Sequence, residues 1–237
     1  MDDSSGKLYL VPTPIGNLED ITQRALRILD EVDIVACEDT RTTGQLLYHF
    51  GLRKKLISYH EYNERSQAGR LAEDLASGKS IAVVTDAGTP GISDPAYRVV
   101  RAALDAGIDI VALPGPSALL PALTASGLPT DRFFFEGFLS PKSAARKRRL
   151  EELADFPHTL VFYESPHRLE KSLDNMREVL GDRPACVARE ISKKFEEFVR
   201  GKLSAVIAAF AGRSVKGEIV VVVAGNNPKL FDREEST

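Results

Sequence analysis

Short apolar runs alternate along this chain with longer segments whose apolar residues recur at helical spacing. After Asp20, for example, Ile21, Ala25 and Ile28 fall on one face of a helix. Gln23 stands three residues after Asp20, which is typical of a capping box, so we expect Asp20 to cap this helix. Because such alternation of strand and helix continues throughout the sequence, the pattern predicts an α/β protein.

The pattern also gives approximate bounds for each element. The predicted strands are residues 7–11, 33–37, 56–59, 81–85, 109–113, 133–139, 159–163, 185–189, 196–200 and 218–224. The predicted helices are residues 21–32, 42–50, 64–76, 95–106, 117–125, 143–153, 168–180 and 203–210. Asp94 followed by Pro95 predicts the start of one helix, with Asp94 as its cap.

A change in the pattern divides the chain into two α/β domains. Residues 126–131 contain Gly, Pro and Ser and are typical of a linker. We therefore expect an N-terminal domain at 7–126 and a C-terminal domain at 132–226, with tails at 1–6 and 227–237. The link between the strands ending at Arg189 and beginning at Glu196 is too short for a crossover helix, so the second domain is expected to contain antiparallel strands.

Composition excludes some function classes. The formal net charge of the 237 residues is -3, so any contact with nucleic acid must come from a local basic patch. The apolar runs are of strand length and too short to cross a membrane. Cys37 and Cys186 lie in predicted buried strands and are expected to be unpaired core residues. With no secretory leader visible at the amino terminus, we expect a cytoplasmic protein that has no membrane partner.

Turns rich in Gly and Pro follow four of the predicted strands, at residues 11–18, 86–93, 113–118 and 163–167. Open α/β sheets bind ligands outside the carboxyl ends of their strands, so these turns indicate a small-molecule cleft. No dinucleotide or Walker phosphate motif is present, and the turns carry little positive charge. Asp86 instead suits a ligand with amino and ribose groups. The alternative for any single turn is a tight connection without function.

Several motifs together resemble a known family. They are residues 8–21, 37–41, 86–95, 113–118, 135–139, 162–168, 188–191 and 216–219. In that order they are similar to the ribosomal RNA small subunit methyltransferase I family, from about Lys7 to Gly225. Ala96 and Ser140 depart from the family pattern, which usually has Gly and Pro there. Neither position belongs to the core of a motif.

The resemblance implies the two-domain tetrapyrrole-methylase (class III methyltransferase) fold, with S-adenosylmethionine in the interdomain cleft and a homodimer as the usual assembly. It also implies methyl transfer to the ribose 2′-hydroxyl of a cytidine in 16S rRNA, near the decoding centre of the small ribosomal subunit. The positions that match cofactor-binding positions of the family are Pro14, Asp86, Gly88, Thr89, Ile92, Ser117 and Ala118, with Tyr163 and Glu190 in the second domain.

Candidate catalytic residues follow the second predicted strand. Glu38 or Asp39 can accept the proton that the hydroxyl loses, and Arg41 can hold a flanking phosphate. The alternative is an Asp39–Arg41 turn or helix cap that only supports the loop. His60 is a weaker candidate for the same proton. The four His residues are scattered, so no metal site is expected.

A basic cluster offers the best candidate for contact with the RNA backbone. Its members are Lys142, Arg146, Lys147, Arg148 and Arg149, which Lys193, Lys194 and Arg200 extend. The alternative is a solvated helix face beside Glu151 and Glu152. Tyr59, Tyr62 and Phe138 can stack on an unpaired nucleotide, although core packing explains Phe138 equally well.

Two other functions remain open for this sequence. One is a corrinoid or porphyrin methyltransferase of the same fold, and the other is a non-catalytic RNA-binding factor for ribosome assembly. Enzymes that act on corrinoids or porphyrins usually carry an acidic Gly-rich loop where this chain has Thr13–Asn17. We expect the RNA methyltransferase.

Overall fold

The computed structural model describes residues 6–231. Contacts divide the chain into two compact units, Met1–Ser117 and Ala118–Thr237. Each unit has its own sheet and its own hydrophobic core. The helix at 119–124 therefore belongs to the second unit, and the segment 126–131 lies inside that unit.

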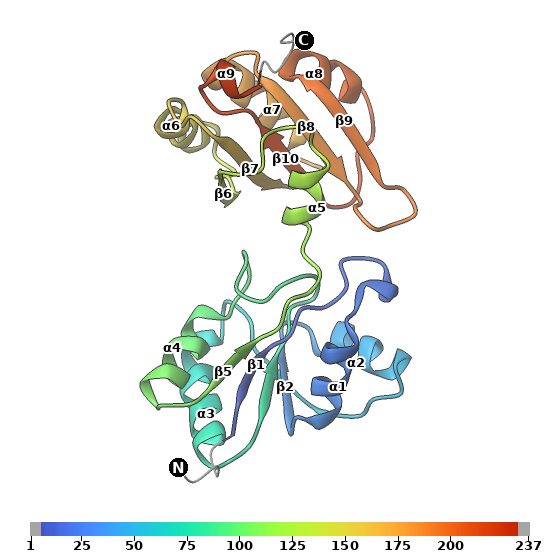
Figure 1. The fold of residues 1–237 in the computed structure, drawn as a ribbon, viewed down its shortest axis with the longest axis vertical. Helices are drawn as coiled ribbons and strands as arrows, with labels where there is room; N and C mark the ends of the chain where they lie inside the picture. Colours follow the sequence, from blue (N-terminus) through green and yellow to red (C-terminus); the bar gives the residue numbers. More distant parts are fainter. Residues whose placement is uncertain (1–5, 232–237) are drawn as a thin grey trace. The chain divides into compact units, whose positions relative to one another are not determined.

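The described part of the first unit is built on a parallel sheet with the strand order β3-β2-β4-β1-β5 (Figure 1). Its strands are β1 (Leu8–Leu10), β2 (Ile34–Cys37), β3 (Lys55–Ser58), β4 (Ile81–Val83) and β5 (Ile110–Ala112). Its helices are η1 (Leu18–Asp20), α1 (Gln23–Glu31), α2 (Thr40–His49), α3 (Glu64–Ala76) and α4 (Tyr97–Asp105). All five strands confirm predicted ones: β3 is shifted by one residue, and the other four are shorter than predicted.

Helices cover both faces of this sheet, which explains why its strands are apolar throughout. In β2, Ile34 and Ala36 pack against α3 and α4, while Val35 and Cys37 pack against α1 and α2. Figure 1 shows α1 and α2 on one side of the sheet and α3 and α4 on the other. The connections from β1 and β2 therefore run to one face of the sheet, and those from β3 and β4 run to the other face.

Two predicted helix caps differ from the structure. Thr22, and not Asp20, caps α1, because its side chain accepts a hydrogen bond from the Ala25 N–H at 3.0 Å. The predicted cap of α4 at Asp94 is also wrong. This helix begins at Tyr97 after Ala96, which forms no side-chain cap.

The second unit contains a mixed sheet with the order β6-β7-β10-β8-β9 in its described part. Only β6 and β7 are parallel to each other there, and the other neighbours are antiparallel, which confirms the expected antiparallel strands. Its strands are β6 (Phe133–Phe138), β7 (Thr159–Glu164), β8 (Pro184–Arg189), β9 (Glu197–Lys202) and β10 (Ile219–Val223). Its helices are α5 (Leu119–Thr124), α6 (Ser143–Leu153), α7 (Leu169–Leu180), α8 (Leu203–Phe210) and α9 (Pro228–Phe231).

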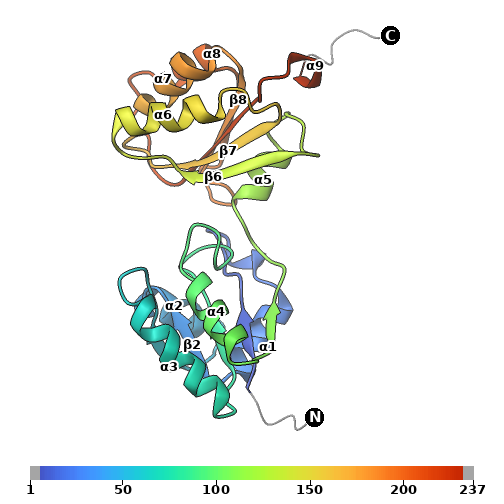
Figure 2. The ribbon, with the colours of Figure 1, turned by 90° about the vertical axis from the view of Figure 1, so that its left-hand side faces the viewer.

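Three helices of the second unit cover one face of its sheet. Figure 2 shows α6, α7 and α8 on that face and α5 on the opposite one. The core beneath the three helices includes Phe162 of β7, Val221 of β10 and Phe210 of α8, all fully buried. Helix α9 was not predicted, since residues 227–237 were expected to be a tail.

Cys37 and Cys186 are buried and unpaired, as expected. Burial raises the pKa of the Cys186 thiol to about 11, so it stays protonated and inert. Between residues 6 and 231, no helix has the length and apolar character needed to cross a membrane.

Candidate active site

Loops after four parallel strands of the first unit meet at one edge of its sheet. The chain leaves β1 and β2 toward α1 and α2 on one face, whereas it leaves β4 toward α4 on the other. β4 lies between β1 and β2. Its loop therefore runs to one face of the sheet, while the loops of the two neighbouring strands run to the other face. Such a reversal is where open α/β sheets form their ligand crevice.

The loops after β1 and β4 are joined by main-chain hydrogen bonds. Thr13 and Gly88 exchange two N–H to carbonyl bonds, both of 2.9 Å. The buried Thr13 hydroxyl donates to the Thr85 carbonyl at 2.9 Å. Gly88 adopts a φ of +96°, a conformation that favours glycine. The Gly and Pro content of these loops thus serves a fixed main-chain arrangement.

The loop after β5 is tied to the same assembly. The Thr89 hydroxyl donates to the Pro116 carbonyl at 2.8 Å. Gly115 lies so close to the loop after β1 that a Cβ there would be 2.6 Å from the Cβ of Pro12. Three of the four Gly and Pro turns therefore come together, and the fourth, at 163–167, belongs to the second unit.

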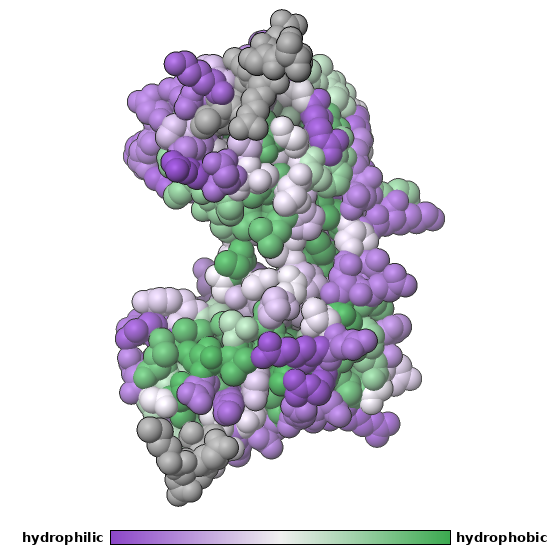
Figure 3. All heavy atoms as spheres, viewed as in Figure 1, coloured by the Kyte–Doolittle hydropathy of each residue, from purple (hydrophilic) through white to green (hydrophobic). Residues whose placement is uncertain are grey.

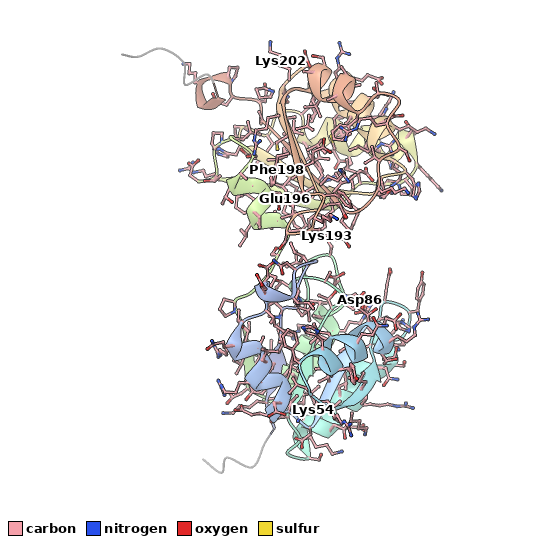
Figure 4. All side chains as sticks on the ribbon, turned by 90° about the vertical axis from the view of Figure 1, so that its right-hand side faces the viewer. Lys54, Asp86, Lys193, Glu196, Phe198 and Lys202 are labelled. Carbon is pink, nitrogen blue, oxygen red and sulfur yellow. The ribbon has the colours of Figure 1, made fainter. Side chains whose placement is uncertain are left out.

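Carboxylates from the loops after β2 and β4 gather at this edge. Glu38 accepts hydrogen bonds from the Thr85 hydroxyl and, at 3.3 Å, from the Asp86 N–H. Asp86 accepts a bond of 3.2 Å from the Asp39 N–H. Partial burial and the charges of Glu38 and Asp39 raise the pKa of Asp86. Figure 4 shows Asp86 at the end of the sheet where these strands finish.

Asp39 has a structural role in this arrangement. It caps α2, its carboxylate accepts the Arg41 N–H at 2.8 Å, and it forms a salt bridge of 2.6 Å with the Arg41 side chain. These bonds with Arg41 hold the pKa of Asp39 at about 2, which makes it a very weak base. The low pKa of Asp39 thus argues against Asp39 as the proton acceptor.

Asp94 also belongs to this site, although the sequence analysis assigned it to a helix cap. It lies near Thr85, Glu38 and Asp86, which all affect its pKa. Burial raises the pKa of Asp94 to about 6, and the charges of Glu38 and Asp86 act in the same direction, whereas Thr85 acts to lower it. Asp before Pro fits a cap equally well, so the sequence carried no separate signal for this role.

The other predicted cofactor positions of the first unit lie on the same loops. Pro14 and Gly88 are buried, Thr89 and Ser117 are half-buried, and Ile92 is 37% exposed. Ala118 is the first residue of the second unit.

In the second unit, Tyr163 and Glu190 flank β10. Tyr163 lies opposite Val220 in the sheet and contacts the rings of Phe135 and Phe138, at centroid distances of 4.9 and 5.6 Å. Glu190 follows β8 on the other side.

The Glu190 carboxylate is engaged within its own unit. It accepts a bond of 2.9 Å from Lys193 and one of 3.1 Å from the Glu218 N–H. Although partial burial acts to raise the pKa of Glu190, these two bonds outweigh it and lower that pKa. The α-carbon of Gly217 lies against the carboxylate, because a Cβ there would be 2.1 Å from Glu190 Oε1. Glu190 thus supports the segment before β10.

Glu164 organises the turn after β7, although no sequence pattern marked this residue individually. This carboxylate is only 2% exposed. It accepts hydrogen bonds from the Ser172 hydroxyl and, at 2.7 Å, from the Ser165 N–H, and it pairs with Arg168 at 2.9 Å. Part of the motif 162–168 therefore serves the fold.

The basic helix α6 corrects one prediction. Arg146 is 3% exposed and does not face solvent, because it shares the buried face of the helix with Leu150 and Leu153. Its guanidinium donates to Asn175 Oδ1 at 2.9 Å and to the Ser140 carbonyl at 3.2 Å. A phosphate cannot reach Arg146 in this position.

The remaining cations of the cluster divide into two pairs. Lys147 forms a salt bridge of 2.6 Å with Glu178, and Arg149 forms bridges of 2.8 Å with Glu136 and 2.7 Å with Glu152. Among the described residues, Lys142 and Arg148 are exposed and form no ion pair. Acidic neighbours thus neutralise half of the exposed basic surface, which favours a solvated face more than the sequence suggested.

The three aromatic candidates differ in their exposure to solvent. Tyr59 is 1% exposed, and its hydroxyl accepts a bond from the Val99 N–H at 3.2 Å, so the prediction that it stacks on a nucleotide is wrong. Tyr62 and Phe138 are 94% and 55% exposed and stay available. The His60 Nδ1 atom is buried without a hydrogen-bond partner in the described part of the chain. No group of three or more potential metal-ligating side chains occurs within residues 6–231.

Comparison with known proteins agrees with this geometry. The sequence profile of the tetrapyrrole (corrin/porphyrin) methylases matches residues 7–207. Solved structures with the same fold include uroporphyrin-III C-methyltransferase from Thermus thermophilus (TM-score 0.65, 22% identity, covering 92% of this chain and 94% of that one). The methyltransferase CobJ is similar as well (TM-score 0.68, 21% identity, covering 94% and 95%). The expected tetrapyrrole-methylase fold is confirmed.

Relatives with higher sequence identity identify the family within the tetrapyrrole methylases. Ribosomal RNA small subunit methyltransferase I of Escherichia coli O157:H7 is 50% identical over 235 residues, covering 98% of this chain and 82% of the relative. The protein of the same name from Halalkalibacterium halodurans is 48% identical over 232 residues (98% and 80%), and that from Vibrio cholerae is 52% identical over 221 residues (92% and 77%). The chain therefore belongs to the ribosomal RNA small subunit methyltransferase I family of tetrapyrrole-type methylases.

Proposed function

We propose that this protein is an S-adenosylmethionine-dependent methyltransferase that methylates the ribose 2′-hydroxyl of a cytidine in 16S rRNA. The observation that carries this proposal is the identity of 48–52% to rRNA methyltransferases over nearly the whole chain. Structural neighbours named for tetrapyrrole or corrinoid chemistry are only about 20% identical and support the fold alone. The rRNA reaction is therefore favoured over a tetrapyrrole substrate.

The candidate site fits the proposed cofactor chemically. S-adenosylmethionine carries an ammonium group, a ribose and a sulfonium, and it has no phosphate. Asp86 is a solvent-accessible carboxylate at the strand edge, suited to an amino group or to ribose hydroxyls. We assign cofactor binding to the loops of Pro14, Asp86, Gly88, Thr89, Ile92, Ser117 and Ala118, with Tyr163 as a contact from the second unit. Glu190 shapes its loop without offering a free carboxylate.

Methyl transfer requires mainly that the attacking hydroxyl be correctly oriented toward the methyl group. The sulfonium supplies an electrophilic methyl group, and correct placement of the attacking hydroxyl can contribute about 7–11 kcal/mol to catalysis. We assign the role of proton acceptor to Glu38, whose carboxylate is held by the Thr85 hydroxyl and the Asp86 N–H. Asp39 positions the start of α2 and holds Arg41, whose exposed guanidinium can bind a phosphate.

Contacts to RNA are proposed at the exposed cations of α6 and at exposed aromatic residues. Lys142 and Arg148 can bind phosphates directly, whereas Lys147 and Arg149 would have to exchange their present carboxylate partners. Tyr62 and Phe138 can stack on unpaired bases.

A homodimer that acts in the cytoplasm on the small ribosomal subunit completes the proposal. Figure 3 shows apolar side chains gathered on the first unit over α4 and β5. Leu104 is 51% exposed there, and β5 is an edge strand with an exposed Ala112. Such a surface on an edge strand is suited to burial against another copy.

A transfer assay separates the three candidate functions. The protein would be incubated with methyl-labelled cofactor and either small ribosomal subunits, naked rRNA or a tetrapyrrole. Label in rRNA from subunits supports the proposal, and label in the tetrapyrrole supports the alternative enzyme. Binding to RNA with no transfer to any substrate would support the assembly factor.

Calorimetry tests the cofactor assignment. Asp86→Ala should weaken S-adenosylmethionine binding about tenfold or more, because a charge-assisted hydrogen bond is lost. Glu73→Ala, at an exposed position of α3, is the matched control and should bind normally. Unchanged affinity in Asp86→Ala would remove this residue from the site.

A further inference from the structure

The edge strand β9 has two different faces. In the described part of the chain it pairs with β8 alone, and residues 190–196 connect the two strands. Side chains alternate along a strand, so Phe198, Arg200 and Lys202 lie on one face, while Val199 lies on the other and packs against the core beneath the helices. Phe198 and Lys202 are labelled along this strand in Figure 4. The two cations of β9 therefore lie on the face that points away from α6, α7 and α8.

The acidic side chains around β9 are engaged by other groups. Glu197, on the opposite face of the strand, forms salt bridges of 3.1 and 2.9 Å with two arginines of neighbouring segments. Asp182 lies near Lys202, but its two carboxylate oxygens accept bonds of 2.7 Å from the N–H and the hydroxyl of Ser204. The exposed cations of β9 and of the connection before it that form no ion pair within residues 6–231 are Lys194, Arg200 and Lys202.

The connection between β8 and β9 contributes one of these cations. Lys193 is not available, because it forms salt bridges of 2.9 and 3.0 Å with two carboxylates. Glu196 accepts the Ser192 N–H at 2.7 Å. Lys194 is exposed beside Phe195, with its Nζ atom 5.6 Å from the centre of that ring. Of the two lysines that the sequence added to the basic cluster here, only Lys194 is free of a carboxylate partner in the described structure.

Aromatic rings accompany the cations. The Arg200 guanidinium lies 5.0 Å from the centre of the Phe198 ring, and Phe195 is 65% exposed. Arg200 also donates bonds of 2.6 and 2.9 Å to the Ala125 carbonyl, at the end of α5. Its Nη1 group forms no hydrogen bond to any residue that the structure describes. One guanidinium is thus held in a fixed orientation with donors left for a ligand.

Cations interleaved with aromatic rings are typical of surfaces that bind single-stranded nucleic acid, because phosphates pair with the cations and bases stack on the rings. We propose that the β9 surface, made of Lys194, Phe195, Phe198, Arg200 and Lys202, binds an unpaired stretch of the rRNA substrate. Its three cations contact phosphates, and Phe195 stacks on a base. This inference rests on the proposed function and adds a second RNA contact to the one on α6.

Charge favours RNA over a protein partner on this surface. On α6, Lys147 and Arg149 already have carboxylate partners, whereas the three cations of the β9 surface have none among the described residues. A symmetric contact with a second copy would bring like charges together. Lysines on an edge strand can also serve only to prevent pairing with other strands. That role needs no aromatic side chain, yet Phe195 is largely exposed beside Lys194.

The salt dependence of RNA binding tests the phosphate contacts. The probe is a fluorescent single-stranded RNA of about 12 nucleotides, and its affinity is measured by anisotropy at several salt concentrations. Lys194→Ala and Lys202→Ala should each lower the slope of log affinity against log salt by about 0.7, the value for one phosphate of a single strand. The double variant should lower the slope by about 1.4. Lys171→Ala, at an exposed position of α7, is the matched control and should keep the wild-type slope.

Phe195→Ala tests the stacking contact separately. It should weaken RNA binding about fivefold or more and leave the salt slope unchanged, because stacking involves no phosphate. Phe195→Tyr keeps an aromatic ring and should bind as the wild type does. All these positions are exposed, so the midpoints of urea unfolding should stay the same. Calorimetry should show unchanged affinity for S-adenosylmethionine in each variant.

Methylation of small ribosomal subunits separates failure of the β9 surface from failure of the proposed function. The double lysine variant and Phe195→Ala should raise KM for the subunits with little change in kcat. A wild type that methylates subunits, together with variants whose KM and salt slope equal its own, would overturn the β9 surface alone. Variants that bind RNA normally but dissociate a wild-type dimer in sedimentation would show a protein interface instead. If the wild type methylates no rRNA, the proposed function itself fails.

Discussion

Asp94→Asn should make the folded protein more stable at neutral pH. An Asp whose pKa is raised by folding binds its proton more tightly in the folded chain than in the unfolded one. The free energy of unfolding therefore falls as pH rises from about 4 to about 6, and it stays at that lower level above this range. Asn is neutral at every pH and keeps a similar shape, so the variant avoids this loss.

The size of the gain follows from the pKa shift. A change from 3.8 to about 6 corresponds to about 2 pH units, or about 3 kcal/mol at 1.36 kcal/mol per unit. Asp94 is only half-buried, and solvent screening lowers this upper bound to about 1–2 kcal/mol.

Urea unfolding at two pH values measures this effect. At about pH 7.5 the variant should be about 1–2 kcal/mol more stable than the wild type, and at about pH 4 the difference should vanish. Asp105→Asn, at an exposed position of α4, is the control and should change stability by less than about 0.5 kcal/mol. An Asp94→Asn protein that is less stable than the wild type at neutral pH, or equally stabilised at both pH values, would refute this reasoning.

Three further substitutions test other parts of the structure. Gly217→Ala should destabilise the fold by about 2 kcal/mol or more in urea unfolding, because its Cβ would overlap the Glu190 carboxylate, while Gly212→Ala has open space and should cost about 1 kcal/mol. Equal losses in the two variants would contradict this. Arg146→Ala should cost about 2–3 kcal/mol, and an unchanged unfolding midpoint would show that the arginine is not buried in solution. Arg148→Ala should lower the slope of log affinity against log salt for an rRNA fragment by about 1, and an unaltered slope would exclude a phosphate contact there.

Much of the fold could be predicted because apolar periodicity reports which faces are buried. The strands of the first unit and the helix α3 lie where the pattern placed them. The Gly and Pro turns also indicated loops that approach closely, and three of these loops lie together at the edge of the first sheet. The division into units was less accessible, because nothing in the sequence near Ser117 shows that α5 packs on β10.

The site was harder to predict because short polar residues serve several purposes. Asp20 and Asp94 both precede helices in a pattern typical of caps, yet Thr22 caps α1, and α4 begins at Tyr97 without a side-chain cap. Arg146 was grouped with its basic neighbours, although its spacing to Leu150 and Leu153 already placed it on the apolar face. Its charge suggested contact with RNA, whereas the helical spacing of the apolar residues indicated a buried position, which the structure confirms.

Nucleoside analysis of 16S rRNA tests the central claim most directly. Small ribosomal subunits from cells that lack this methyltransferase would be incubated with the protein and S-adenosylmethionine carrying a deuterated methyl group, then digested and examined by mass spectrometry. The account predicts deuterated 2′-O-methylcytidine from a single position of the rRNA, and none with Glu38→Gln. Deuterium on a base, or no deuterium in the rRNA of any sample, would contradict it.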